Sequence, residues 1–204
     1  VSAQANLNLD ALIYSIETEI KTPEHDVKKS PVMHVLRSFD INKPGSKIAN
    51  IKGGVIGGSL TEGQFNIGDE IEIKPGLLNE KKKNYEPLIT EIVSLGTGAG
   101  TVDNVKPGGL VAIGTKLDPN LTRGDSFIGS VIGKPDSLPE NSDTAKLKVS
   151  LFDSAVGSAS NEKIAPINMG EMLRLNIGTA PIPGKVTKVK GNDIEVALRR
   201  PACL

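Results

Sequence analysis

Four glycines lie within six positions of the segment Lys52-Gly-Gly-Val-Ile-Gly-Gly-Ser59. Backbone without side chains is the usual cradle for a phosphate group, so this segment is the first place to look for chemistry. A phosphate-binding loop lies between a strand and a helix and ends in Lys-Ser or Lys-Thr. Here an Ile/Glu alternation typical of a strand follows, at residues 68–73. The spacing therefore predicts glycines inside a β-hairpin, either at a barrel corner or where a flat ligand approaches bare backbone.

A second pair of glycines, Gly108 and Gly109, enters an apolar strand pattern at residues 110–113. Glu91 lies on the strand pattern between the two glycine segments, at residues 88–95. The two segments and this carboxylate could line one pocket, although pattern alone leaves the strand order open. Ser2-Ala3-Gln4 precedes a helical pattern, where free backbone N–H groups can meet a ligand.

Other kinds of chemistry find little support. The sequence contains no Gly-x-x-x-x-Gly-Lys-Ser/Thr, only two histidines and a single cysteine, Cys203. These counts exclude a disulfide framework and a cysteine-rich zinc site, and we expect no catalytic residue and no metal. Twenty-four basic and 24 acidic residues cancel, so no global field attracts nucleic acid or membrane. No apolar run reaches membrane-spanning length, and the single cysteine favours a cytoplasmic location.

The elements that must position these residues are one helix and many short strands. Leu9, Leu12, Ile13 and Ile16 have helical spacing, which predicts an amphipathic helix over residues 8–21 with Asn8 as its N-cap. That apolar face needs a body outside this sequence. Strand patterns then run over Val32–Phe39, Val55–Leu60, Glu70–Ile73, Leu88–Leu95, Leu110–Ile113 and Phe127–Ile132.

We therefore predict an all-β fold of two consecutive β units preceded by one helix, and the strand spacing suggests a closed barrel or a sandwich. The expected divisions are residues 1–22 as the end of another domain, 23–30 as a linker, 31–138 as the first β unit and 139–204 as a second, incomplete β unit. Residues 157–163 are expected to form a polar loop. Since the sequence starts without Met and ends close to a strand pattern, we interpret it as a fragment.

Several segments together resemble the gamma subunit of archaeal and eukaryotic translation initiation factor 2. The two longest matching segments are residues 37–45 (RSFDINKPG) and 106–118 (KPGGLVAIGTKLD), and the likeness extends in order over nearly the whole chain. It implies two translation-factor barrels and a helix left from a GTP-binding domain. It also implies GTP or GDP with Mg in the intact protein, with no cofactor or GTPase activity expected from residues 1–204.

The same resemblance implies roles for individual residues. Ser2, Ala3 and Gln4 would form the last guanine-contacting motif. The pocket for the 3′ end of methionylated initiator tRNA would be lined by Val55, Ile56, Gly57, Gly58, Glu91, Gly108 and Gly109. Implied partners are the initiator tRNA, an alpha subunit on the first barrel, a beta subunit on the GTP-binding domain and the small ribosomal subunit.

Two other functions stay open from the sequence. One is a specialised elongation factor for an unusual aminoacyl-tRNA. The other is a non-catalytic interaction module in which the glycines serve only to close the barrel.

Overall fold

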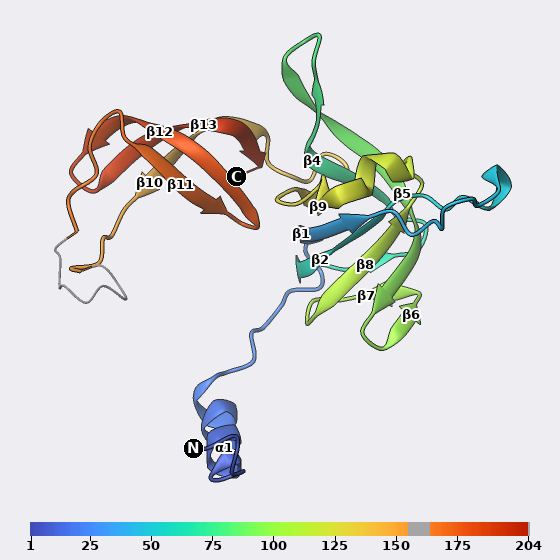
Figure 1. The fold of residues 1–204 in the computed structure, drawn as a ribbon, viewed down its shortest axis with the longest axis horizontal. Helices are drawn as coiled ribbons and strands as arrows, with labels where there is room; N and C mark the ends of the chain where they lie inside the picture. Colours follow the sequence, from blue (N-terminus) through green and yellow to red (C-terminus); the bar gives the residue numbers. More distant parts are fainter. Residues whose placement is uncertain (155–163, 204) are drawn as a thin grey trace.

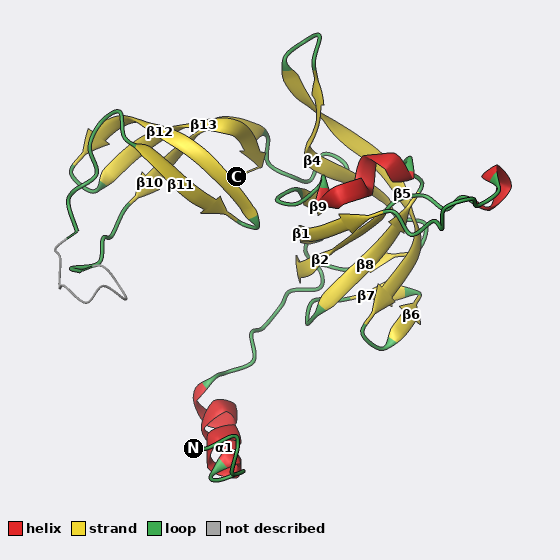
Figure 2. Ribbon diagram, in the orientation of Figure 1, coloured by secondary structure: helices red, strands yellow, loops and turns green. Residues whose placement is uncertain are grey.

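The computed structural model describes residues 1–154 and 164–203, and strands dominate it (Figures 1 and 2). The loop expected at 157–163 lies outside the described residues. The first β region contains β1 (Val32–Phe39), β2 (Val55–Glu62), β3 (Phe65–Asn66), β4 (Glu70–Asn79), β5 (Asn84–Thr97), β6 (Gly100–Val102), β7 (Asn104–Val105), β8 (Leu110–Thr115) and β9 (Val131–Gly133). The second contains β10 (Asn141–Lys148), β11 (Met172–Ile177), β12 (Ala180–Lys190) and β13 (Asp193–Cys203). Short 3₁₀ helices are η1 (Ile48–Asn50) and η2 (Pro119–Asp125).

The first β region is a closed antiparallel barrel. Its strands follow the order β4-β9-β1-β2-β8-β5, and β5 pairs back with β4 to complete a ring of six. The short strand β6 continues the sheet beside β5. Closure removes the free edges that an open sheet would leave. Of the barrel and the sandwich that the strand spacing left open, the barrel is confirmed.

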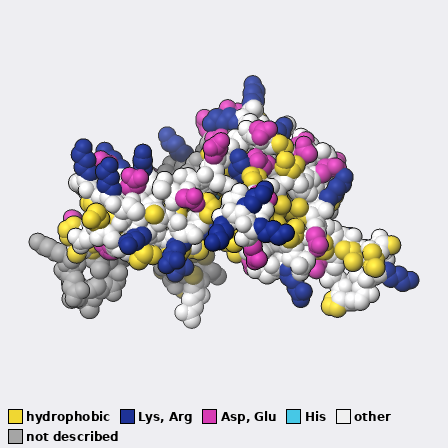
Figure 3. Space-filling model, turned by 90° about the horizontal axis from the view of Figure 1, so that it is seen from above, with side chains coloured by type: hydrophobic (Ala, Val, Ile, Leu, Met, Phe, Trp, Pro, Cys, Tyr) yellow, Lys and Arg dark blue, Asp and Glu magenta, His cyan; other side chains and the backbone are white. Residues whose placement is uncertain are grey.

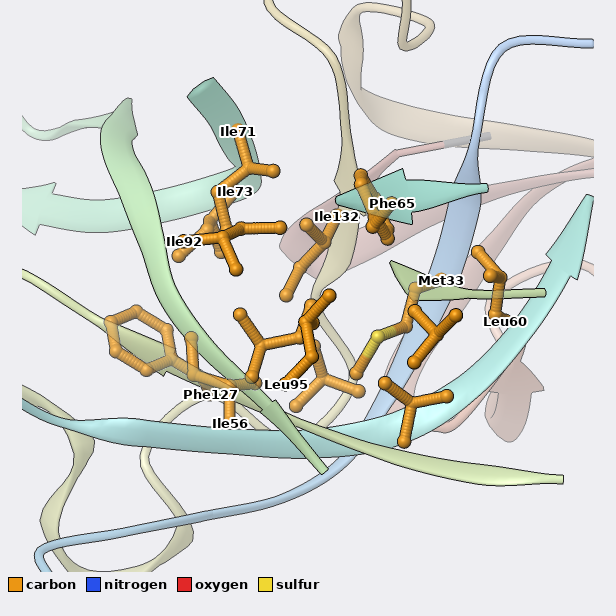
Figure 4. Packing of buried hydrophobic residues seen from close by; sticks show 14 residues of the cluster. Met33, Ile56, Leu60, Phe65, Ile71, Ile73, Ile92, Leu95, Phe127 and Ile132 are labelled. Carbon is orange, nitrogen blue, oxygen red and sulfur yellow. The ribbon is translucent and has the colours of Figure 1, made fainter. Parts of the chain in front are cut away.

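Alternating residues of the barrel strands fill its interior (Figure 4). On β2, Ile56 and Leu60 point inward and are at most 1% exposed. They pack with Met33 of β1 and Ile92 of β5 in one cluster. The rigid platform for any site on the outside of β2 is therefore a dry aliphatic core.

The second β region is a four-stranded antiparallel sheet in the order β10-β13-β12-β11. Its buried side chains form two small clusters, around Ile182 and around Val196. The sequence predicted an incomplete barrel here, and what the structure describes is a sheet. Thr179, in the turn between β11 and β12, donates a hydrogen bond of 2.6 Å to the Val35 carbonyl and so joins this sheet to the barrel.

The predicted helix is present as α1 (Leu9–Glu19), shorter than expected. None of its residues is buried, so the apolar face is unpartnered within the described residues, as the sequence implied. Asn8 occupies the predicted N-cap position but does not cap the helix through its side chain. Asn8 adopts a left-handed backbone, with φ 57° and ψ 32°, and its side chain makes no capping hydrogen bond.

At the sixth predicted strand the structure differs in conformation as well as in boundaries. The segment predicted as Phe127–Ile132 is a strand only from Val131, in β9. Phe127 instead lies in a turn after η2 and fills the core at 1% exposure. Gly129, at φ +82°, interrupts the extended backbone between them. The apolar run predicted burial correctly but assigned the wrong conformation to its first half.

Candidate functional site

The four glycines around β2 divide into those that the fold requires and one that it does not. A Cβ on Gly53 would lie 1.9 Å from the Thr115 carbonyl oxygen, and one on Gly54 would lie 2.3 Å from the Thr122 side chain. On Gly58 it would lie 2.1 Å from the His34 carbonyl oxygen. All three positions exclude any larger residue on steric grounds. They serve barrel packing.

Gly57 is different. A Cβ there would meet nothing closer than 3.8 Å, and its φ lies outside the left-handed region that favours glycine. Barrel closure therefore does not explain this glycine. Because β2 alternates, Gly57 faces outward, away from the core that holds Ile56.

Gly57 and Gly58 form part of the floor of a groove of about 580 Å³ on the outside of the barrel. Gly96, near the end of β5, Gly98, in the turn to β6, and Gly100, the first residue of β6, extend this floor. A Cβ on Gly96 would have 3.8 Å of clearance, and one on Gly98 or Gly100 would meet nothing within 4 Å. Side chains at these positions would protrude into the groove, so its flat floor exists because they are absent.

The walls of the groove are apolar. Leu36 and Phe39 of β1 and Leu110 of β8 line it and are 38%, 40% and 68% exposed. A glycine floor between aliphatic and aromatic walls suits a flat, weakly polar group such as a nucleobase, which needs contact area more than charge.

One ion pair borders the groove. Nε of Arg37, a groove residue on β1, donates to both carboxylate oxygens of Asp125 at 2.9 and 3.1 Å. The Ser38 backbone N–H donates to the same carboxylate at 2.9 Å. The Arg37 hydrogen bond, followed by the Ser38 hydrogen bond, lowers the pKa of Asp125 from its ordinary value.

The structure separates the residues that the sequence proposed for the pocket. Only Gly57 and Gly58 line the glycine-floored groove. Ile56 points into the core at 0% exposure and can shape a pocket only by fixing β2. Val55 faces a neighbouring hollow of about 520 Å³, at the other end of β8, together with Lys116.

Glu91, Gly108 and Gly109 lie outside the lining of the glycine-floored groove. Glu91, on β5, makes a 2.6 Å ion pair with Lys116, which borders the Val55 hollow. Gly108 and Gly109 precede Leu110 on the groove wall, and a Cβ on either would meet nothing within 4 Å. Gly108 adopts φ +129°, so a side chain there would be strained.

Ser2, Ala3 and Gln4 form a turn before α1. Ser2 and Leu7 exchange two backbone hydrogen bonds of 3.0 Å, which close the turn. Ser2 Oγ accepts a further bond from the Ala5 N–H at 3.3 Å. Among the hydrogen bonds of the described residues, none uses the Ala3 N–H, and Ala3 and Gln4 are exposed.

Sequence reasoning missed the walls of the groove and three of its five floor glycines. The alternating glycines of Gly96-Thr-Gly-Ala-Gly100 were a readable signal of the same kind as residues 53–58. Leu36 and Phe39 gave no signal, because single exposed apolar residues are common on protein surfaces. In residues 1–154 and 164–203, no three His, Cys, Asp or Glu side chains are grouped as a metal site would require. None of the helices in these ranges is long and apolar enough to cross a bilayer.

A closed antiparallel barrel followed by a second antiparallel sheet, with a glycine-floored groove on the barrel, defines a class of mostly-β proteins with a candidate binding site on the barrel surface, and comparison with known proteins specifies the family. Residues 143–204 match the family model "Initiation factor eIF2 gamma, C terminal". Translation initiation factor 2 subunit gamma of Thermococcus onnurineus is 49% identical over 100% of this chain and 50% of its own length. The Methanosarcina mazei protein of the same name is 49% identical over 98% of this chain and 47% of its own length.

The chain belongs to the translation initiation factor 2 gamma family. The matches run over its whole length, from the turn at Ser2 to β13, and include the glycine-rich β2. The chain spans about half the length of the curated relatives it matches, 50% in the first case.

Proposed function

We propose that this chain supplies the barrel that holds the 3′ end of methionylated initiator tRNA in a GTP-dependent translation initiation factor, which delivers the tRNA to the small ribosomal subunit. The observation that carries the proposal is Gly57, a glycine that packing does not require, on the floor of a base-sized apolar groove. A terminal adenosine would lie flat on this floor against Phe39 and Leu110. Stacking and apolar contact bind such a base without a strong field, which fits a chain of zero net charge.

The groove and the Val55 hollow together can accommodate a nucleotide with its attached amino acid. The two hollows lie at opposite ends of β8, at residues 110–112 and 114–116, and Gly108 and Gly109 precede its first residue. We assign the ribose hydroxyls to Glu91, whose carboxylate accepts hydrogen bonds and already lies 2.6 Å from Lys116.

The test is a pair of substitutions at Gly57 in the full-length protein. Gly57→Leu fills the groove floor and is expected to weaken binding of methionylated initiator tRNA about tenfold or more, the value of one stacked base. Gly57→Ala, with 3.8 Å of clearance, is the matched control and should retain most of the affinity. Unchanged affinity in a folded Gly57→Leu protein would favour the interaction-module alternative.

The same assay separates initiation from elongation. The proposal predicts a preference for methionylated initiator tRNA over an aminoacylated elongator tRNA. An equal or reversed preference would instead support the specialised elongation factor.

GTP enters the proposal through the intact protein. GTP or GDP with Mg would bind the domain to which the Ser2–Gln4 turn belongs, and the free Ala3 N–H is suited to donate to the guanine carbonyl. GTP would order segments that close on the barrel, and hydrolysis would release the tRNA. A polypeptide of residues 1–204 should show no saturable GTP turnover, and turnover above that of a barrel variant would contradict this part.

The partners follow the same assignment. We place an alpha subunit on the first barrel and a beta subunit on the GTP-binding domain, which gives a heterotrimer. The relatives are themselves named as subunits, which supports an assembly. Co-purification of the full-length protein with each subunit, with and without residues 31–138, tests the placement.

A further inference from the structure

The outer face of the four-stranded sheet carries a regular set of charges far along the chain from the glycine-floored groove. On β13, Asp193 and Glu195 alternate with Ile194 and Val196, which are buried in the sheet's own core. The two carboxylates therefore share the opposite, solvent-facing side. Because β13 lies between β10 and β12, each carboxylate has a neighbour on both sides.

All four of these neighbours are lysines. Directly paired residues of antiparallel strands point to the same face of the sheet. The pairing gives two parallel rows, one of Lys146, Glu195 and Lys188 and the other of Lys148, Asp193 and Lys190. We call these six residues the lysine face.

The lysines of this face are available to a ligand. All four are exposed, and within residues 1–154 and 164–203 none of them forms an ion pair with any carboxylate. All six residues line one hollow of about 480 Å³. Figure 3 shows Lys and Arg side chains gathered at the side of the molecule that carries this sheet.

We propose that the lysine face binds the sugar–phosphate backbone of an RNA strand. This site goes beyond the proposed function, since it involves neither the glycine-floored groove nor an aminoacyl end. The two lysines of β10 and the two lysines of β12 form two columns, one on each side of β13 at the strand spacing of about 4.8 Å. Each column would contact successive phosphates of the RNA strand. Four cations against two carboxylates leave the face positive in a chain with no net charge.

The two carboxylates decide between RNA and other polyanions. Asp193 and Glu195 lie between the lysines, so a ligand carrying only negative charge would be repelled at the centre of the hollow. RNA offers phosphates to the lysines and, between them, 2′-hydroxyl donors that a carboxylate can accept. DNA lacks this hydroxyl, and an acidic peptide would add a second set of carboxylates.

Filter binding of an unacylated, single-stranded RNA of about 20 nucleotides to the full-length protein tests the proposal, since site sizes are shorter than this. The double variant Lys188→Gln/Lys190→Gln should reduce the slope of log affinity against log salt by about 1.4, or 0.7 for each phosphate that a lysine no longer neutralises. The matched control, Lys28→Gln/Lys81→Gln, removes two exposed lysines elsewhere and should leave the slope unchanged. An unchanged slope in the first variant, or an equal change in both, would overturn the proposal.

A second measurement addresses the sugar. The wild-type protein should bind the RNA more tightly than DNA of the same sequence, and Glu195→Ala should reduce that ratio. Equal binding of RNA and DNA, or competition by polyglutamate as strong as that by RNA at equal charge, would contradict the RNA assignment. Because Lys188 and Lys190 lie outside the glycine-floored groove, their effect on the salt slope is independent of Gly57→Leu and its effect on initiator tRNA.

Discussion

Arg37 and Asp125, 88 positions apart, form a two-contact ion pair on the outside of the barrel, with Nε 2.9 and 3.1 Å from the two carboxylate oxygens. Asp125 also accepts the Ser38 N–H, so one carboxylate fixes the end of η2 against β1. The pair therefore ties η2 to the strand that supplies Leu36 and Phe39 to the groove.

Asp125→Asn is expected to destabilise the barrel at neutral pH. The pKa of Asp125 is lowered in the folded state, chiefly by the Arg37 hydrogen bond, so its contribution is present above the pKa of the unfolded chain. It is lost as pH falls through the lower, folded pKa. Urea unfolding from pH 7 to pH 3 should thus show the wild type and variant converging in acid. A constant difference across this range would show that the effect is not electrostatic.

Gly58→Ala tests the division of the glycines into structural and functional ones. Its Cβ would lie 2.1 Å from the His34 carbonyl oxygen, so strands β1 and β2 would have to move apart. We expect the free energy of unfolding to fall by about 1–3 kcal/mol, the usual cost of overpacking a core. Gly57→Ala should lose far less. Similar losses for the two variants in denaturant titrations would contradict the assignment.

Ile56→Ala should lower the stability of the barrel and leave tRNA binding by the folded protein nearly unchanged. Ile56 is 0% exposed in the barrel core, and truncation of a buried isoleucine costs about 2–5 kcal/mol. At a temperature where the variant is still fully folded, its tRNA affinity should be close to that of the wild type. A folded Ile56→Ala protein with tenfold weaker tRNA binding would place Ile56 in the pocket after all.

Glu91→Gln separates a ligand role from a structural one. The Glu91–Lys116 pair is 2.6 Å long, but its side chains are 44% and 60% exposed, so its loss should change stability by no more than about 1 kcal/mol. Calorimetric titration with initiator tRNA should show a several-fold weaker affinity, because the hydroxyl acceptor loses its charge. A change in stability without a change in affinity would show that Glu91 serves only in the ion pair with Lys116.

The sequence by itself determined the class of fold and the order of its parts. Short segments of alternating apolar and polar residues, bounded by Gly, Pro and Asn, predicted the strands. A two-residue period gathers the apolar side chains on one face only in a β-strand. The helical spacing from Leu9 to Ile16 likewise predicted α1 and its unpartnered face. These features are local, so the chain carries them without reference to distant residues.

The tertiary structure decided which residues meet. Two glycines adjacent in the sequence, Gly57 and Gly58, differ in role because one faces solvent and the other faces the backbone of β1. The groove joins residues 57 and 96 only because β8 lies between β2 and β5, an order that no local pattern contains. The lysine face has the same origin, since β13 pairs on one side with β10, about 50 residues earlier. Strand order depends on long-range pairing, so the sites that depend on it became visible only in the folded chain.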